Sequence, residues 1–199
     1  MSDRGLAGRA AAAARLLLAP PDPAVLESLA PLAEAPLRLE AARQDFYDFL
    51  CVPQSGCYIP PYAHVLARGE WNGEYWHFPP PRYDGGDTLR AWYEAAGFDP
   101  AALEVDPLIA GANRPLDHAG FVLAFLAGLL AQAETEPDGA PVVAVFAAEH
   151  LGAWVDLLAE LLAVSGSPYI SLLGGGLHEL VAELRAGFGA VDEPVEGAA

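Results

Sequence analysis

The sequence predicts an all-α fold, built as a single helical bundle of two lobes that are joined by a hinge loop. Apolar residues recur at helical spacing along most of the chain. No convincing segment alternates apolar and polar residues between tight hairpin turns, as paired strands do. With 199 residues, 53% of them hydrophobic, the chain is long enough to bury a substantial core.

Prolines, capping residues and glycines bound the predicted helices of the first half. These helices cover residues 5–19, a segment that Asp22 caps, residues 37–50, residues 62–68, and a segment that Asp87 caps and Gly97 ends. The intervening segment 71–83 contains three consecutive prolines, so we expect it to be irregular.

The second half is more apolar. Residues 116–133 are apolar nearly all round, which is typical of a helix enclosed by others. Two more helices are predicted at 142–164 and 169–188, with a kink or break at the Gly174-Gly175-Gly176 run. The predicted parts are an N-terminal helical lobe at 1–105, a hinge linker at 106–115, a C-terminal helical lobe at 116–189 and a disordered tail at 190–199.

The chain is strongly acidic, with a formal net charge of -17. A nucleic acid or an anionic phospholipid surface is therefore repelled at long range, whereas a basic peptide is attracted. The alternative is that the charge only keeps a very apolar protein soluble.

No feature predicts export or stable insertion into a membrane. Three arginines interrupt the first 19 residues, so this segment lacks the continuous apolar region of a signal peptide. The apolar stretch 119–131 is too short to span a bilayer, and the stretch 140–164 carries charged side chains. We therefore expect a cytoplasmic protein.

No motif for catalysis or for cofactor binding stands out. Cys51 and Cys57 lack a recognisable nucleophile motif, and no two histidines have the four-residue spacing of helical metal ligands. We expect no enzyme activity, no metal and no cofactor. The alternative is a small metal-dependent hydrolase, whose ligands would be Asp117, His118, Glu149 and His150.

Three motifs, in this order, resemble those of one known family. Residues 46–50 and 60–62, Phe-Tyr-Asp-Phe-Leu and Pro-Pro-Tyr, resemble a signature of the TorD/DmsD/NarJ chaperones. Residues 114–118, Arg-Pro-Leu-Asp-His, resemble the Glu-Pro-x-Asp-His motif of that family, with Arg114 in place of Glu. Residues 146–169 follow its order of Phe, Glu-His-Leu, Trp, and then Pro with an aromatic residue.

This resemblance implies a TorD-like fold and a dedicated, non-catalytic chaperone. Members of the family bind the twin-arginine leader peptide and the apo form of a molybdopterin oxidoreductase, and they delay export until the cofactor is inserted. The implied partners are the catalytic subunit of such an enzyme and its leader. We expect mainly a monomer. A domain-swapped dimer is the alternative, because members of the family exchange lobes across such a linker.

The resemblance also places a peptide-binding site between the lobes. Its residues are Pro115, Asp117 and His118, together with aromatic side chains that offer apolar or cation–π contacts, namely Tyr62, Trp71, Trp76 and Trp92. A carboxylate there pairs well with a leader guanidinium. Two alternatives remain: Asp117 only caps a helix that has His118 in its first turn, or the chain is a permanent accessory subunit of an oxidoreductase complex.

Overall fold

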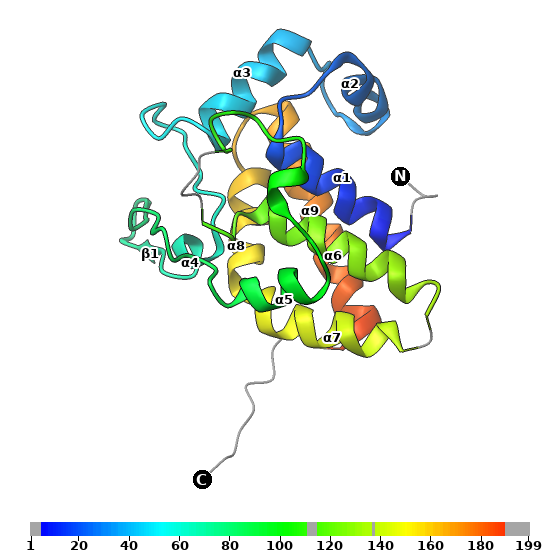
Figure 1. Ribbon diagram of the computed structural model, residues 1–199. Helices are drawn as coiled ribbons and strands as arrows, with labels where there is room; N and C mark the ends of the chain where they lie inside the picture. Colours follow the sequence, from blue (N-terminus) through cyan, green and yellow to red (C-terminus); the bar gives the residue numbers. More distant parts are fainter. Residues whose placement is uncertain (1–4, 111–114, 137, 190–199) are drawn as a thin grey trace.

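Helices make up most of the structure, a computed structural model that describes residues 5–110, 115–136 and 138–189 (Figure 1). The α-helices within these residues are α1 (Leu6–Leu18), α2 (Pro23–Leu29), α3 (Leu39–Leu50), α4 (Ala63–Leu66), α5 (Leu89–Ala95), α6 (Ala119–Ala133), α7 (Gly139–His150), α8 (Ala153–Ala163) and α9 (Pro168–Phe188). Two short 3-10 helices, η1 (Ala30–Leu32) and η2 (Pro100–Ala102), and one hairpin of β1 (Glu70–Trp71) and β2 (Trp76–His77) are also present. The predicted all-α fold is confirmed.

Helix α6 lies in the core, as its apolar sequence predicts. Nine of its side-chain positions are buried, and they point to more than one side of the helix. α1 lies beside it (Figure 1). Gly120 permits this close packing, because a Cβ atom there would come within 2.6 Å of Leu18 on α1. The first helix of the chain is therefore part of the same core as α6.

Helix α9 is the longest described helix, and it packs against α1, α3, α7 and α8. It runs without interruption through Gly174-Gly175-Gly176, so a break in the helix at this run is wrong, whereas the alternative of a kink stays a prediction. Gly174 instead lets α8 approach α9 closely, since a Cβ atom at this position would lie 2.7 Å from the Cα of Ala163. Close packing outweighs the low helix propensity of glycine here.

The single helix predicted at 142–164 is also wrong. The structure divides this stretch into α7 and α8, which meet at an angle of 74°. Gly152 is the N-cap residue of α8, and the indole N–H of Trp154 donates to the carbonyl of His150 at 2.8 Å. This hydrogen bond satisfies a carbonyl that the end of α7 leaves without a helical partner, which stabilises the break.

The segment 71–83 is more regular than predicted, because β1 and β2 pair across it. Trp71 lies opposite Trp76 in the antiparallel register. The turn between them is built by Asn72, whose side-chain oxygen accepts from the backbone N–H groups of Glu74 and Tyr75 at 3.0 and 2.9 Å. Gly73 follows with a φ of 98°, which favours glycine. The Asn-Gly pair was the turn signal that the prediction missed.

One of the two predicted helix caps in the first half is confirmed and the other is wrong. Asp22 accepts from the backbone N–H of Val25 at 2.8 Å, which confirms it as the cap of α2. The predicted cap at Asp87 is wrong, because α5 begins after Thr88 without a side-chain cap and the Asp87 carboxylate pairs with Arg90 at 3.2 Å. Gly97 has a φ of 64° just after α5, which fits its predicted role at the helix end.

The predicted two-lobe division stays a prediction. The buried residues form one apolar cluster that draws on both predicted lobes. Asp106, at the start of the predicted linker, is held by its backbone N–H to Leu18 at 2.8 Å and by the Tyr47 hydroxyl at 3.0 Å. Residues 111–114 of the linker, with Arg114, and the predicted disordered tail at 190–199 lie outside the described residues.

By length and composition, no one helix in the described part of the chain qualifies as a membrane span. The bent pair α7 and α8 passes the same criteria when its two helices are taken together.

The packing of α8 on α9 gives a direct test of the glycine run. We expect Gly174→Ala to lower the free energy of unfolding by about 1–3 kcal/mol, because its Cβ atom has no room against Ala163. Gly175→Ala is the control: its Cβ atom meets nothing within 4 Å, so the higher helix propensity of alanine should add up to about 1 kcal/mol. Urea denaturation measures both, and equal effects of the two substitutions contradict the close approach.

Candidate functional site

Three chain segments meet at the start of α6. We call residues 61–64, 82–86 and 116–119 the three-segment junction. Its backbone bonds join Ala63 N–H to the carbonyl of Asp117 at 3.1 Å, Ala119 N–H to Pro61 at 2.7 Å, and Leu116 N–H to Gly85 at 2.9 Å. Segments far apart in the sequence are thus tied by main-chain hydrogen bonds, which fix their register.

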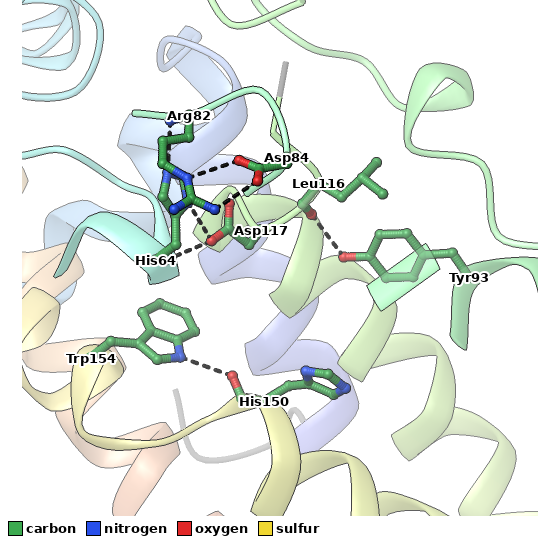
Figure 2. A network of polar contacts seen from close by, with 8 residues as sticks. All are labelled: His64, Arg82, Asp84, Tyr93, Leu116, Asp117, His150 and Trp154. Carbon is green, nitrogen blue, oxygen red and sulfur yellow. Dashed lines mark hydrogen bonds and ion pairs between the residues drawn. The ribbon is translucent and has the colours of Figure 1, made fainter. Parts of the chain in front are cut away.

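The side chain at the centre of this junction is Asp117. Its Oδ2 atom accepts from the backbone N–H of His64 at 2.6 Å and lies 2.7 Å from the Nδ1 atom of the same residue (Figure 2). Only 3% of Asp117 is exposed to solvent. A carboxylate this deeply buried requires hydrogen-bond donors, and both of these come from one histidine at the start of α4.

The other ring nitrogen of His64 fixes its protonation state. Its Nε2 atom accepts the backbone N–H of Arg82 at 2.9 Å, so Nε2 carries no proton and Nδ1 donates to Asp117. The guanidinium of Arg82 in turn forms two hydrogen bonds to Asp84, at 2.8 and 2.7 Å (Figure 2). These bonds lower the pKa of the Asp84 carboxyl. A continuous polar chain therefore runs from buried Asp117 to exposed Asp84.

Two adjacent glycines, Gly85 and Gly86, allow the segment 82–86 to lie against the pair of Asp117 and His64. Gly86 has a φ of 77°, and a Cβ atom there would lie 2.6 Å from the backbone nitrogen of Asp117. A Cβ atom on Gly85 would overlap the ring of His64. Glycine is therefore required at 86 by both conformation and space.

His118 caps α6, so the predicted cap at Asp117 is wrong. The Nδ1 atom of His118 accepts from the backbone N–H of Gly120 at 3.1 Å, and the residue is only 1% exposed. Its ring meets that of Tyr62 edge-on at 5.3 Å. Burial raises the pKa of the Tyr62 hydroxyl, and the nearby Asp117 carboxylate raises it further. The predicted residues Tyr62, Asp117 and His118 are thus brought together, with buried Pro115 at the start of the same segment.

The hairpin of β1 and β2 follows α4 and carries exposed aromatic side chains. Trp71 and Tyr75 are 55% and 58% exposed. Trp76 is partly covered, because it stacks on Phe78 with ring centroids 6.1 Å apart. Exposed Glu70 and Glu74 lie in the same hairpin. We call residues 70–76 the aromatic hairpin; among the predicted site residues, Trp71 is the most exposed.

Trp92 lies in a different environment, on α5 against α6 and α7. Its indole N–H donates to Glu149 at 3.1 Å, and its ring packs edge-on against Phe146 at 5.3 Å and against His150 at 6.0 Å. Burial lowers the pKa of His150, and the neighbouring Glu149 opposes this shift. The structure therefore does not place Trp92 in direct contact with Asp117 or with the aromatic hairpin within the described residues.

A comparison with known families decides what kind of protein carries this junction. The nitrate reductase delta subunit family matches residues 17–160, which is well over half of the chain. The chain belongs to this family. The predicted resemblance to redox-enzyme maturation chaperones is confirmed, and membership supports a chaperone role in molybdoenzyme maturation. No curated protein and no solved structure matches the chain significantly.

The geometry of this delta-subunit family chain gives little support to metal chemistry. Among the described residues, no three His, Cys, Asp or Glu side chains converge as metal ligands, so the set Asp117, His118, Glu149 and His150 is not assembled. Cys51 is also a poor nucleophile, because burial raises the pKa of its thiol to about 12, with a smaller contribution from Asp106.

His64, the most important partner of Asp117, was not among the predicted site residues, although the segment that contains it was predicted to be helical. Arg82, Gly85 and Gly86 were not among those residues either. The available signal was the run Asp84-Gly85-Gly86-Asp87, since adjacent glycines often mark a close backbone approach. Whether Pro115, Asp117 and His118 bind a peptide stays a prediction.

The junction predicts that Asp117 is important for stability. Asp117→Ala removes the acceptor of two hydrogen bonds and leaves buried donors unpaired, so we expect the free energy of unfolding to fall by about 2–4 kcal/mol. Asp87→Ala, at an exposed surface pair, should change it by less than about 0.5 kcal/mol. Urea denaturation distinguishes them, and similar small effects of both substitutions contradict the proposed importance of the junction.

The pKa of Cys51 gives a pH test. Since the thiolate is the reactive form, and its fraction rises tenfold per pH unit below a pKa of about 12, iodoacetamide labelling of Cys51 should accelerate about tenfold per unit from pH 8 to 10. Cys57→Ser provides a chain with Cys51 as its single thiol, and urea-unfolded protein serves as the control. A labelling rate that levels off near pH 9 in the folded chain contradicts the raised pKa.

Proposed function

We propose that this chain is a cytoplasmic chaperone that binds the twin-arginine leader and the apo form of a molybdopterin oxidoreductase. It supports cofactor insertion and delays export. The observation that carries this proposal is the aromatic hairpin, which a chain of the nitrate reductase delta subunit family exposes beside the hydrogen-bonded three-segment junction. The client is an enzyme whose leader is basic and then apolar.

The aromatic hairpin suits such a leader in both charge and shape. Glu70 and Glu74 offer carboxylates to guanidinium groups, and the net charge of -17 adds long-range attraction. Trp71 offers a ring face for a cation–π contact, and Tyr75 and Trp76 offer apolar area to the residues that follow. Large exposed aromatic side chains are typical of the energetic centres of interfaces.

Pro115, Asp117 and His118 lie in one segment at the junction, beside the chain that leads to and from this surface. The Asp117–His64 pair holds α4, from which the hairpin emerges, and the His64–Arg82 bond holds the chain that returns from it. The Oδ1 atom of Asp117 is buried and has no hydrogen-bond partner among the described residues. If the Gly85-Gly86 segment moves aside, this oxygen is the acceptor that a leader guanidinium meets.

Tyr62 and Trp92 contribute at the edges of the proposed surface. Tyr62 is partly exposed and packs on His118, so it extends the junction toward solvent. Trp92 orders α5, and the neighbouring Tyr93 donates its hydroxyl to the carbonyl of Leu116 at 3.2 Å (Figure 2). A leader contact at Trp92 requires a peptide that extends past α5 toward Glu149.

Calorimetry with a leader peptide tests the function. The probe is a synthetic twin-arginine leader peptide of a molybdopterin oxidoreductase, with a version in which both arginines are replaced by alanine as a control. We expect the native chain to bind the first peptide, and Trp71→Ala with Tyr75→Ala to bind it at least about tenfold more weakly. Leu108→Ala, at another exposed apolar side chain, should leave binding unchanged.

The outcomes separate the function from the site. No binding by the native chain, or equal binding of both peptides, overturns leader recognition. Full binding by the hairpin variant, with a normal melting temperature, moves the leader to another surface. Co-purification then distinguishes a chaperone from a permanent accessory subunit, because a chaperone is absent from the mature, cofactor-loaded enzyme.

A further inference from the structure

A groove of about 880 Å³ opens on a part of the molecule that the junction and the aromatic hairpin do not reach. This volume is in the range of binding pockets in proteins. It lies between η1, the end of α8 and the first half of α9. Its lining includes Arg9, Leu32, Glu34, Val164, Leu172 and Glu179, and none of its residues belongs to the aromatic hairpin.

One face of α9 forms the floor of this groove. Ser171, Leu172, Gly175, Gly176 and Glu179 line it, and their spacing of one, four, five and eight residues is that of a single helical face. The neighbouring Gly174 packs closely against the end of α8. Cβ atoms on Gly175 and Gly176 would meet nothing within 4 Å, so the corresponding space beside these two glycines is open.

Apolar side chains border the floor and are left in solvent. Val164, at the end of α8, is 74% exposed, and Leu32 in η1 is 37% exposed. Exposing them together costs hydrophobic free energy that a bound apolar segment would recover. A helix without side chains at two adjacent positions also permits another backbone to approach closely, because ridges on the partner fit the gap.

The charged side chains that line the groove indicate what charge a bound partner segment would carry. Arg9 is the lining cation, and Glu183 holds its guanidinium in a two-pronged ion pair. Glu34 and Glu179 form no ion pair within the described ranges, although Glu179 adds a smaller electrostatic contribution to the raised pKa of Arg9. The hydroxyl of Ser167, at the start of α9, already bonds Asp45 at 2.6 Å. The carboxylates of Glu34 and Glu179 therefore make the groove acidic beside the Leu172, Gly175 and Gly176 positions of its floor.

We propose that this groove docks an amphipathic α-helix of a partner protein, with the backbone of that helix over Gly175 and Gly176. Its apolar side chains contact Val164 and Leu32, and its Arg or Lys side chains pair with Glu34 and Glu179. A second copy of this chain is the wrong occupant, since each copy has a net charge of -17. This surface is additional to the proposed leader site and does not depend on it.

The proposed docking is tested by placing a leucine side chain at each floor glycine and measuring peptide binding. The probe is a fluorescent 14-residue peptide of leucine and lysine that forms an amphipathic helix, titrated against the full chain by anisotropy. Gly175→Leu and Gly176→Leu should each weaken binding about tenfold or more, because the new side chain occupies the contact. Gly128→Leu is the matched control, since Gly128 is also an exposed helical glycine with nothing within 4 Å of its Cβ position. It should bind as the native chain does.

A charge variant and a charge-reversed peptide complete the experiment. Glu34→Gln with Glu179→Gln should weaken binding about threefold or more at low salt, and a leucine–glutamate peptide should not bind. Equal weakening by Gly128→Leu and Gly175→Leu, or undiminished binding by both floor variants, overturns the groove. Circular dichroism confirms that each variant is folded.

The same variants separate this inference from the proposed function. Gly175→Leu should bind the twin-arginine leader like the native chain, while the hairpin variant of Trp71 and Tyr75 should keep its affinity for the leucine–lysine peptide. If Gly175→Leu loses both peptides while it stays folded, the groove is supported and the leader binds there instead of at the hairpin. If it loses neither, the groove is wrong and leader binding is unaffected.

Discussion

The buried carboxylate of Asp117 is the constraint on which the three-segment junction depends. A carboxylate with 3% exposure is stable only when donors reach it, and His64 supplies both a backbone and a ring donor. Satisfying His64 in turn requires the N–H of Arg82, and that approach requires glycine at 85 and 86. One buried carboxylate thereby determines the positions of three chain segments, one of which is the start of α6.

Much of the bundle follows from sequence because its signals are local. The helix over residues 5–19 and the cap at Asp22 depend on helix formers and prolines that are adjacent in the chain. The errors occurred where long-range packing overrides local preference. Gly174 continues a helix because α8 presses against it, and Gly152 breaks one because the Trp154 indole satisfies the exposed carbonyl of His150.

The candidate site was also predictable only in part, because its motif is local while the contacts that build the site are long-range. The segment 115–118 was recognised through its motif, but a motif does not show that His118 caps the helix while Asp117 reaches back to His64 across 53 residues of chain. No local pattern encodes such a pair. The sequence placed Trp71 and Trp92 in one set of candidate peptide contacts. Only the fold distinguishes them, because Trp71 is exposed and Trp92 packs against Phe146.

The hydrogen bond between Arg82 and His64 closes a loop around the aromatic hairpin, because the two residues are 18 positions apart. A closed loop samples fewer conformations than a free one, and this loss of entropy is incurred once, when the chain folds. The backbone of the hairpin is therefore already restrained before a ligand of the kind proposed above would bind. For such a ligand, the same contacts would give tighter binding, because less ordering of the backbone would remain to oppose association.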